Sequence, residues 1–288
     1  MLIANPIYDV VFKYLMEDIE IARDLLSVII GRNIVELTLK PQETSTESES
    51  AGRILKIYRL DFKAIIKDKS GKTEKVLIEL QKSKKTTDVM RFRNYLAANY
   101  GKEDEIINEQ GAQEIKPLPI ITIYFLGYKL DNVTVPVLKV QNCYYDVIRN
   151  ERVEDIGDES FIHLLNHESY TIQIPYLKNE MKTQLENVLM VFSQEFVTEN
   201  KQQLDITEQS DDPLAQKIIR RLSRAAGDKA LRTKMDLEDE WDRIYKRELQ
   251  GLADKVAERD EVILQKDKEL SAKDKLIEEL KKQLKDKK

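Results

Sequence analysis

The sequence predicts an α/β (α+β) protein with a mixed β-sheet flanked by helices and a long helical, coiled-coil tail at its C-terminal end. Within residues 1–200, segments with apolar residues at helical spacing alternate with short β-branched runs, a pattern typical of helices packed on a sheet. Beyond Asp212-Pro213 the chain is charged, poor in glycine and rich in helix-forming residues. From Leu249, apolar residues recur every seven positions, as in one half of a coiled-coil seam.

Composition limits the function classes. The 288 residues are 41% hydrophobic, enough for a sizeable core, and the net charge of -5 gives no global signature of a nucleic-acid binder. Any phosphate contacts must therefore be local. The single Cys143 excludes an internal disulfide and a cysteine-clustered zinc site. We find no signal peptide and no apolar run that could span a membrane, so we expect a soluble cytoplasmic protein.

The first elements are expected to be two helices. Asn5 is the expected N-cap of the first helix, with Pro6 at its first position and apolar residues following at helical spacing. A second helix should end at Gly31, where a left-handed cap costs little. Residues 41–52 are polar and are expected to form a surface loop.

The sheet is expected from several later runs. Residues 53–66 and 75–81 are predicted as two strands, and residues 119–128 as a buried central strand because they are apolar and β-branched. Between them, a helix should run from an N-cap at Thr87 to a stop at Gly101. Further strands are expected around Pro136 and Pro175, which restrict them to edges or ends, and residues 178–198 return to a helical pattern.

We therefore expect a first domain over residues 1–200, a helical linker over 201–235 and a charged long helix over 236–288. The seven-residue repeat consists of Leu249, Val256, Ile263, Leu270, Ile277 and Leu284. The companion positions three residues later are apolar only at the two ends, because Arg259, Lys266 and Lys273 occupy the middle. Both a self-associating coiled coil, expected as a dimer, and a solvated single helix fit this pattern.

The two strands at residues 53–66 and 75–81 should form a hairpin. The turn Asp68-Lys69-Ser70-Gly71 fits a type I turn with glycine in the left-handed position. This turn predicts Asp61 opposite Glu79. Strand alternation then collects the apolar residues on one face and gathers Arg59, Asp61, Lys63, Glu79 and Gln81 on the other.

Two carboxylates directly across a ladder repel each other and need a compensating cation. A magnesium ion would serve, because it prefers oxygen ligands and is often held by one or two carboxylates. Alternatively, Lys63 and Arg59 neutralise the pair on an ordinary solvated sheet face. The spacing alone allows both interpretations.

These residues resemble a known family. Asp61 on one strand and Glu79-Leu80-Gln81 on the next look like the core of the PD-(D/E)XK nuclease superfamily. With the early NPIYDVVFKYLM and the RFRNYLAANY helix, they look more narrowly like the recombination-promoting nuclease (Rpn) and putative transposase group. The resemblance is strongest over residues 5–128 and leaves out the charged tail.

The resemblance implies a restriction-endonuclease-like fold and a Mg²⁺-dependent DNA endonuclease associated with transposition or recombination. Asp61 and Glu79 would be metal ligands and catalytic residues. Gln81 would stand where the superfamily usually has lysine, and could orient the attacking water without taking its proton. Leu60 departs from the proline in the superfamily name. The alternative is an inactive nuclease-like fold that serves as a DNA-binding or coiled-coil interaction module.

The resemblance also implies roles for residues outside the hairpin. Asp9 and Lys13 match the group's early motif, so Asp9 could join the metal shell and Lys13 could bind the scissile phosphate. An ordinary helical ion pair is the alternative. A local basic run after the hairpin, either a DNA contact or a solvated helix start, consists of Lys82, Lys84, Lys85, Arg91 and Arg93.

Two other motifs give weaker evidence of function. Ser70-Gly71-Lys72-Thr73 ends like a phosphate-binding loop, but Ile66 stands where its first glycine should be. His163 and His167 are spaced like zinc ligands on a helix, yet no third ligand is evident in the sequence.

Overall fold

We describe the chain from a computed structural model. It describes residues 1–40, 59–67, 73–83, 89–107, 112–154, 156, 160–178, 180, 182–206 and 210–285. The expected surface loop at 41–52, the hairpin turn at 68–71 and the helix cap Thr87 lie outside these residues.

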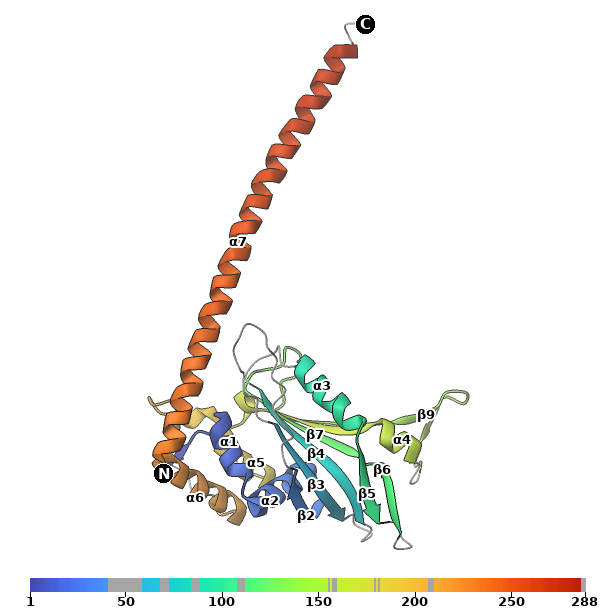
Figure 1. Cartoon of the computed structure of the whole chain (residues 1–288), viewed down its shortest axis with the longest axis vertical. Coiled ribbons are helices and arrows are strands. Elements are labelled where there is room, and N and C mark those ends of the chain that lie inside the picture. The colour runs from blue at the N-terminus through green and yellow to red at the C-terminus, as the bar shows by residue number, and fades with distance from the viewer. Residues whose placement is uncertain are drawn as a thin grey trace. The chain divides into compact units, whose positions relative to one another are not determined.

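A six-stranded mixed sheet forms the centre of the first part of the chain (Figure 1). Its strands, in spatial order, are β2 (Asn33–Leu39), β3 (Arg59–Lys67), β4 (Thr73–Ser83), β7 (Ile120–Leu126), β11 (His167–Gln173) and β8 (Val137–Val140). β7 is parallel to both of its neighbours, and the other pairs are antiparallel. The prediction of a buried central strand over 119–128 is confirmed, since β7 lies inside the sheet and is buried along most of its length.

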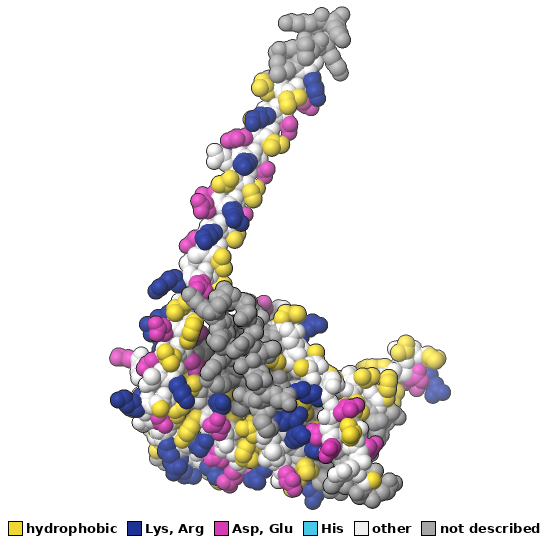
Figure 2. Space-filling model, in the orientation of Figure 1, with side chains coloured by type: hydrophobic (Ala, Val, Ile, Leu, Met, Phe, Trp, Pro, Cys, Tyr) yellow, Lys and Arg dark blue, Asp and Glu magenta, His cyan; other side chains and the backbone are white. Residues whose placement is uncertain are grey.

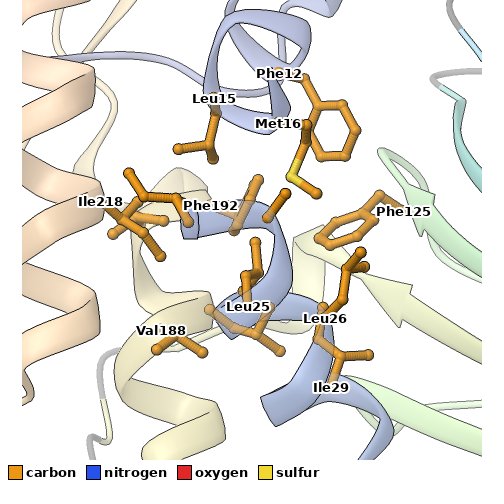
Figure 3. Packing of buried hydrophobic residues seen from close by; sticks show 14 of the residues in the cluster. Phe12, Leu15, Met16, Leu25, Leu26, Ile29, Phe125, Val188, Phe192 and Ile218 are labelled. Carbon is orange, nitrogen blue, oxygen red and sulfur yellow. The ribbon is translucent and has the colours of Figure 1, made fainter. Parts of the chain in front are cut away.

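One face of the sheet carries the main core. It is covered by α1 (Asp9–Met16), α2 (Ile19–Ile30), α5 (Gln184–Leu189) and α6 (Pro213–Gly227), while α3 (Val89–Tyr100) lies on the other side of the strands (Figure 1). Phe12 of α1, Phe125 of β7 and Phe192 pack ring against ring at centroid distances of 5.0 to 6.1 Å. Figure 3 shows these rings with Met16 and Leu26 in the same cluster. The core therefore joins α1 and α2 firmly to the sheet.

Two short strands and α6 extend this unit beyond residue 200. β1 (Leu2–Ala4) pairs with β12 (Gln203–Asp205), and α6 begins at Pro213 with Asp212 as its N-cap. Ile218 and Leu222 of α6 are fully buried. Residues 201–235, which we predicted as a linker, thus include elements of the first compact unit, Met1–Met235.

The second unit, Asp236–Lys288, consists of the continuation of α7 (Lys229–Lys285), a single helix of 57 residues. The predicted long charged helix is confirmed. None of the helices in the described part of the chain combines the length and apolar character needed to cross a bilayer.

The remaining elements are small. Two hairpins are formed by β5 (Glu103–Ile107) with β6 (Gln113–Pro117) and by β9 (Tyr144–Asp146) with β10 (Glu151–Val153), and α4 (Ser160–Leu165) precedes β11. The described residues also contain three 3-10 turns: η2 (Ile174–Tyr176), η3 (Met190–Phe192) and η4 (Gln194–Phe196).

Two predicted helix boundaries are wrong. The first helix begins at Asp9, because the side chain of Asn5 accepts a hydrogen bond from the Ile7 amide and forms a turn before the helix. The helical pattern over 178–198 resolves into α5 and two 3-10 turns, because buried Ser193 donates to the Leu177 carbonyl and its backbone is extended. The second helix ends at Gly31 in the left-handed conformation (φ 65°), as predicted.

Candidate metal and nucleic-acid site

The β3–β4 ladder places Asp61 directly opposite Glu79. Their Cα atoms are partners in the antiparallel register, as are those of Phe62 and Ile78. The predicted register is therefore confirmed. The side chains of Asp61, Glu79 and Gln81 lie outside the described residues, so the site is built here from strand positions and from the side chains around them.

Strand alternation assigns these positions to the face of α3. Phe62 and Ile78 belong to the core under α1 and α2, so positions 61, 79 and 81 fall on the opposite face. On that face the ring of Tyr124 in β7 stacks on Phe92 of α3, with centroids 5.2 Å apart. The acidic positions therefore share a face with α3.

Thr122 is the described polar side chain next to this pair. Its Cα is the β7 partner of Glu79 in the parallel β4–β7 register, and its side chain is fully buried. Among the described residues, its hydroxyl oxygen has no hydrogen-bond partner. A buried unpaired hydroxyl costs about 1–3 kcal/mol, so its presence beside Glu79 needs a reason.

Lys82 lies on the other face of the same strand. Its ammonium is 2.7 Å from Asp9 Oδ1, donates to the Ile7 carbonyl and lies 5.9 Å from the centre of the Phe12 ring. Its side chain is only 3% exposed. A lysine that is buried and paired is not available to a phosphate at the surface, so the predicted DNA contact does not fit Lys82.

Through this pair, Asp9 of α1 contacts the sheet on the face that α1 covers. The structure brings it to Lys82, at the end of β4 that also carries positions 79 and 81. Its predicted place in a metal shell stays a prediction. Lys13 forms a partly exposed ion pair with Glu17 across 3.9 Å, one helical turn away. This pair joins Lys13 to a different acid from the Asp9–Lys13 helical pair that the sequence offered as the alternative.

Asp104, a further acidic residue, is bound by two lysines of the hairpin. Asp104 of β5 contacts Lys63 at 2.5 Å and Lys75 at 3.4 Å. Burial of this carboxyl acts to raise its pKa, but the hydrogen bond from Lys63 and the charge of Lys75 prevail, so the pKa of Asp104 lies below its ordinary value. Lys63, one of the two cations that could neutralise Asp61 and Glu79, is thus engaged with Asp104.

The remaining residues of the predicted basic run are only partly described. Lys84 and Lys85 lie outside the described residues, as does the side chain of Arg91. Arg93 is exposed on α3, at a cavity of about 280 Å³ that Phe92 and Tyr124 also line. Because Tyr124 is the β7 partner of Gln81, this cavity adjoins the candidate site.

The two histidines lie on different elements rather than on one helix face. His163 is on α4, whereas His167 begins β11 and its Nδ1 shares a hydrogen bond of 2.6 Å with the hydroxyl of Tyr100. Burial lowers the pKa of His167. No group of three or more histidine, cysteine or acidic side chains with metal-binding geometry occurs within the part of the chain that is described.

Comparison with known proteins does not assign the site. The chain matched no protein-family model, no curated protein and no solved structure. The case for a function therefore rests on the residues themselves.

Sequence reasoning missed Thr122 and the Lys82–Asp9 pair. A signal for Lys82 was present, since the alternation that separates Asp61 from Phe62 also places position 82 with Ile78 on the apolar face. For Thr122 we find no such signal, because a lone threonine in a β-branched run is ordinary.

Proposed function

We propose that this chain is a Mg²⁺-dependent DNA endonuclease with a PD-(D/E)XK-type active site. The observation that carries the proposal is the ladder register, in which Asp61 stands directly opposite Glu79. The mixed sheet with helices on both faces is compatible with a restriction-endonuclease-like fold.

The donors near this position suit a hard divalent cation. Two carboxylates on adjacent strands, with the Thr122 hydroxyl beside one of them, are oxygen ligands of the kind that magnesium prefers. An ion shared by Asp61 and Glu79 would also relieve their mutual repulsion. Bound magnesium would supply a water of lowered pKa and a positive charge next to the scissile phosphate.

The other residues would position the reactants. Gln81 would orient the water whose oxygen forms the new bond to phosphorus as the bond to the departing sugar oxygen breaks. Arg93, exposed on α3, would hold the DNA backbone near this point, together with Lys84, Lys85 and Arg91 of the basic run. The buried Lys82–Asp9 pair would fix the end of β4 and hence the place of Glu79.

Thr122 supports a functional interpretation over a purely structural one. A fold selected for stability alone gains by replacing a buried, unpaired hydroxyl with a methyl group. Retaining such a group at a site beside Glu79 is expected where stability is given up for activity. We assign Thr122 a positioning role, in which its hydroxyl, unpaired among the described residues, would bind a water molecule on the magnesium once the ion is held.

Nicking of supercoiled plasmid tests the proposal. We expect cleavage by the native chain with Mg²⁺ and none after chelation. Asp61→Asn and Glu79→Gln should each reduce the rate by at least about 100-fold, since even indirect metal partners cost about 10–100-fold. Glu74→Gln is the matched control, because Glu74 is an exposed acid on the same strand.

The outcome also separates the proposal from its rival. Cleavage that survives both site substitutions, or that the native chain never shows, contradicts the endonuclease. DNA binding without cleavage would favour an inactive nuclease-like module that only binds DNA.

A further inference from the structure

The second unit carries an uncovered apolar stripe. Leu249, Val256, Ile263, Leu270 and Ile277 repeat every seven residues along α7, and each is between 47% and 62% exposed. Figure 2 shows hydrophobic side chains distributed along this helix between charged ones. An isolated helix gains nothing from such a stripe, which is typical of a helix that packs against another.

The charged residues beside the stripe also repeat. Three positions after each of Val256, Ile263 and Leu270 stands a basic residue, followed directly by an aspartate: Arg259-Asp260, Lys266-Asp267 and Lys273-Asp274. If the apolar residues occupy position a of a heptad, the basic residues fall at d and the aspartates at e. The seam thus alternates apolar layers with charged ones.

The three aspartates have no basic residue at ion-pairing distance along their own helix. Ion pairs on a helix surface form between residues three or four apart. The residues at these distances from Asp260, Asp267 and Asp274 include neither lysine nor arginine. A pattern made to stabilise a solvated single helix would supply such partners, so the aspartates are placed for charges on a different helix.

We propose that α7 of this chain and α7 of a second copy form a parallel, in-register two-stranded coiled coil. In that arrangement a side chain at d inserts beside position e of the facing helix. Arg259, Lys266 and Lys273 of each copy then meet Asp260, Asp267 and Asp274 of the other. The apolar layers supply the attraction. At each basic layer the two identical d side chains face each other, and the aspartates at e of both copies offset their repulsion and so favour this register.

The antiparallel alternative is disfavoured by the same residues. Antiparallel helices place position e of one copy against position e of the other, which sets aspartate against aspartate in three repeats when the helices are centred on Asp267. Like charges at such positions select against the wrong pairing. This inference does not depend on the chemistry proposed for Asp61 and Glu79, and its failure would leave that chemistry untouched.

Same-residue disulfide cross-linking tests the geometry. In full-length protein with Cys143, which is exposed, replaced by serine, Leu249→Cys and Ile277→Cys are made separately. In a parallel in-register dimer, each new cysteine lies next to the same cysteine of the second chain. Oxidation should therefore convert most of either variant to a covalent dimer. Glu261→Cys is the control, since position 261 lies on the outer side of the helix and should cross-link several-fold less.

Two different results would contradict the parallel dimer. Cross-links that form only in a mixture of the Leu249→Cys and Ile277→Cys proteins would show antiparallel helices. A native chain that is monomeric by light scattering at micromolar concentration would overturn the coiled coil itself.

Charge exchange tests the pairs across the interface. One variant carries Asp260→Lys, Asp267→Lys and Asp274→Lys, and the other carries Arg259→Asp, Lys266→Asp and Lys273→Asp. Each alone should dimerise at least about 10-fold more weakly than the native chain, and the mixture should form the heterodimer. If each variant alone dimerises like the native chain, or the mixture stays monomeric, the proposed pairs do not exist.

Discussion

Replacing Lys82 with methionine should destabilise the first unit well beyond the loss of an ordinary ion pair. The ammonium of Lys82 binds Asp9 at 2.7 Å and donates to the Ile7 carbonyl, with the side chain 3% exposed. Methionine keeps the unbranched stem and its packing on Phe12 but removes both polar contacts. The variant therefore isolates the contribution of the charge.

The magnitude follows from what each partner loses. The Ile7 carbonyl loses a charged donor, which costs about 1–3 kcal/mol. Asp9 is about one-third exposed, so water can replace part of the lost contact and its share is nearer 1 kcal/mol. We expect a loss of about 2–4 kcal/mol in the free energy of unfolding.

Urea unfolding of a chain ending at Met235, followed by far-UV circular dichroism, measures this without a signal from the second unit. Lys13→Met is the matched control, because its pair with Glu17 is a long, partly exposed helical pair that should be worth no more than about 0.5 kcal/mol. Combining Lys82→Met with Asp9→Asn should show that the two losses are not additive. A Lys82→Met loss as small as that of Lys13→Met would refute the reasoning.

Further expectations concern Thr122, His167 and the tail. Thr122→Val should raise the free energy of unfolding by about 1 kcal/mol while slowing plasmid nicking, and a variant that is destabilised, or stabilised with full activity, would contradict its positioning role. Because burial lowers the pKa of His167, the neutral form is favoured in the folded state, so stability should be complete above its ordinary value of 6.5 and fall as pH drops through the lower folded pKa. His167→Gln should flatten this dependence in urea unfolding measured from about pH 7 to about pH 5, and an unchanged slope would count against it. A chain ending at Met235 should be monomeric by light scattering. If this shorter chain is still a dimer, association does not depend on the second unit.

The sheet and the hairpin register could be predicted because short-range rules decide them. A run of β-branched residues identified β7, and the turn expected at residues 68–71 predicted the register that sets Asp61 opposite Glu79. The end of the second helix at Gly31 follows from the same kind of local rule.

Contacts between distant segments could not be predicted in this way. The helix predicted from Asn5 starts later because Asn5 binds Gln194 and the Lys201 carbonyl, almost two hundred residues away in the chain. Likewise, α6 belongs to the core because Arg221 donates to the Tyr14 carbonyl and Ile218 is buried. Helical spacing indicates that a buried face exists but not which surface covers it.

The measurement that most directly tests the central claim is a titration with Mn²⁺, an oxygen-preferring ion that can take the place of magnesium. The account predicts one ion per chain at the site of Asp61 and Glu79. Asp61→Asn, Glu79→Gln and the double variant should each lose it to a similar degree, because both residues hold the same ion. Binding that neither substitution weakens, or losses that simply add in the double variant, would show that the two residues do not share a metal.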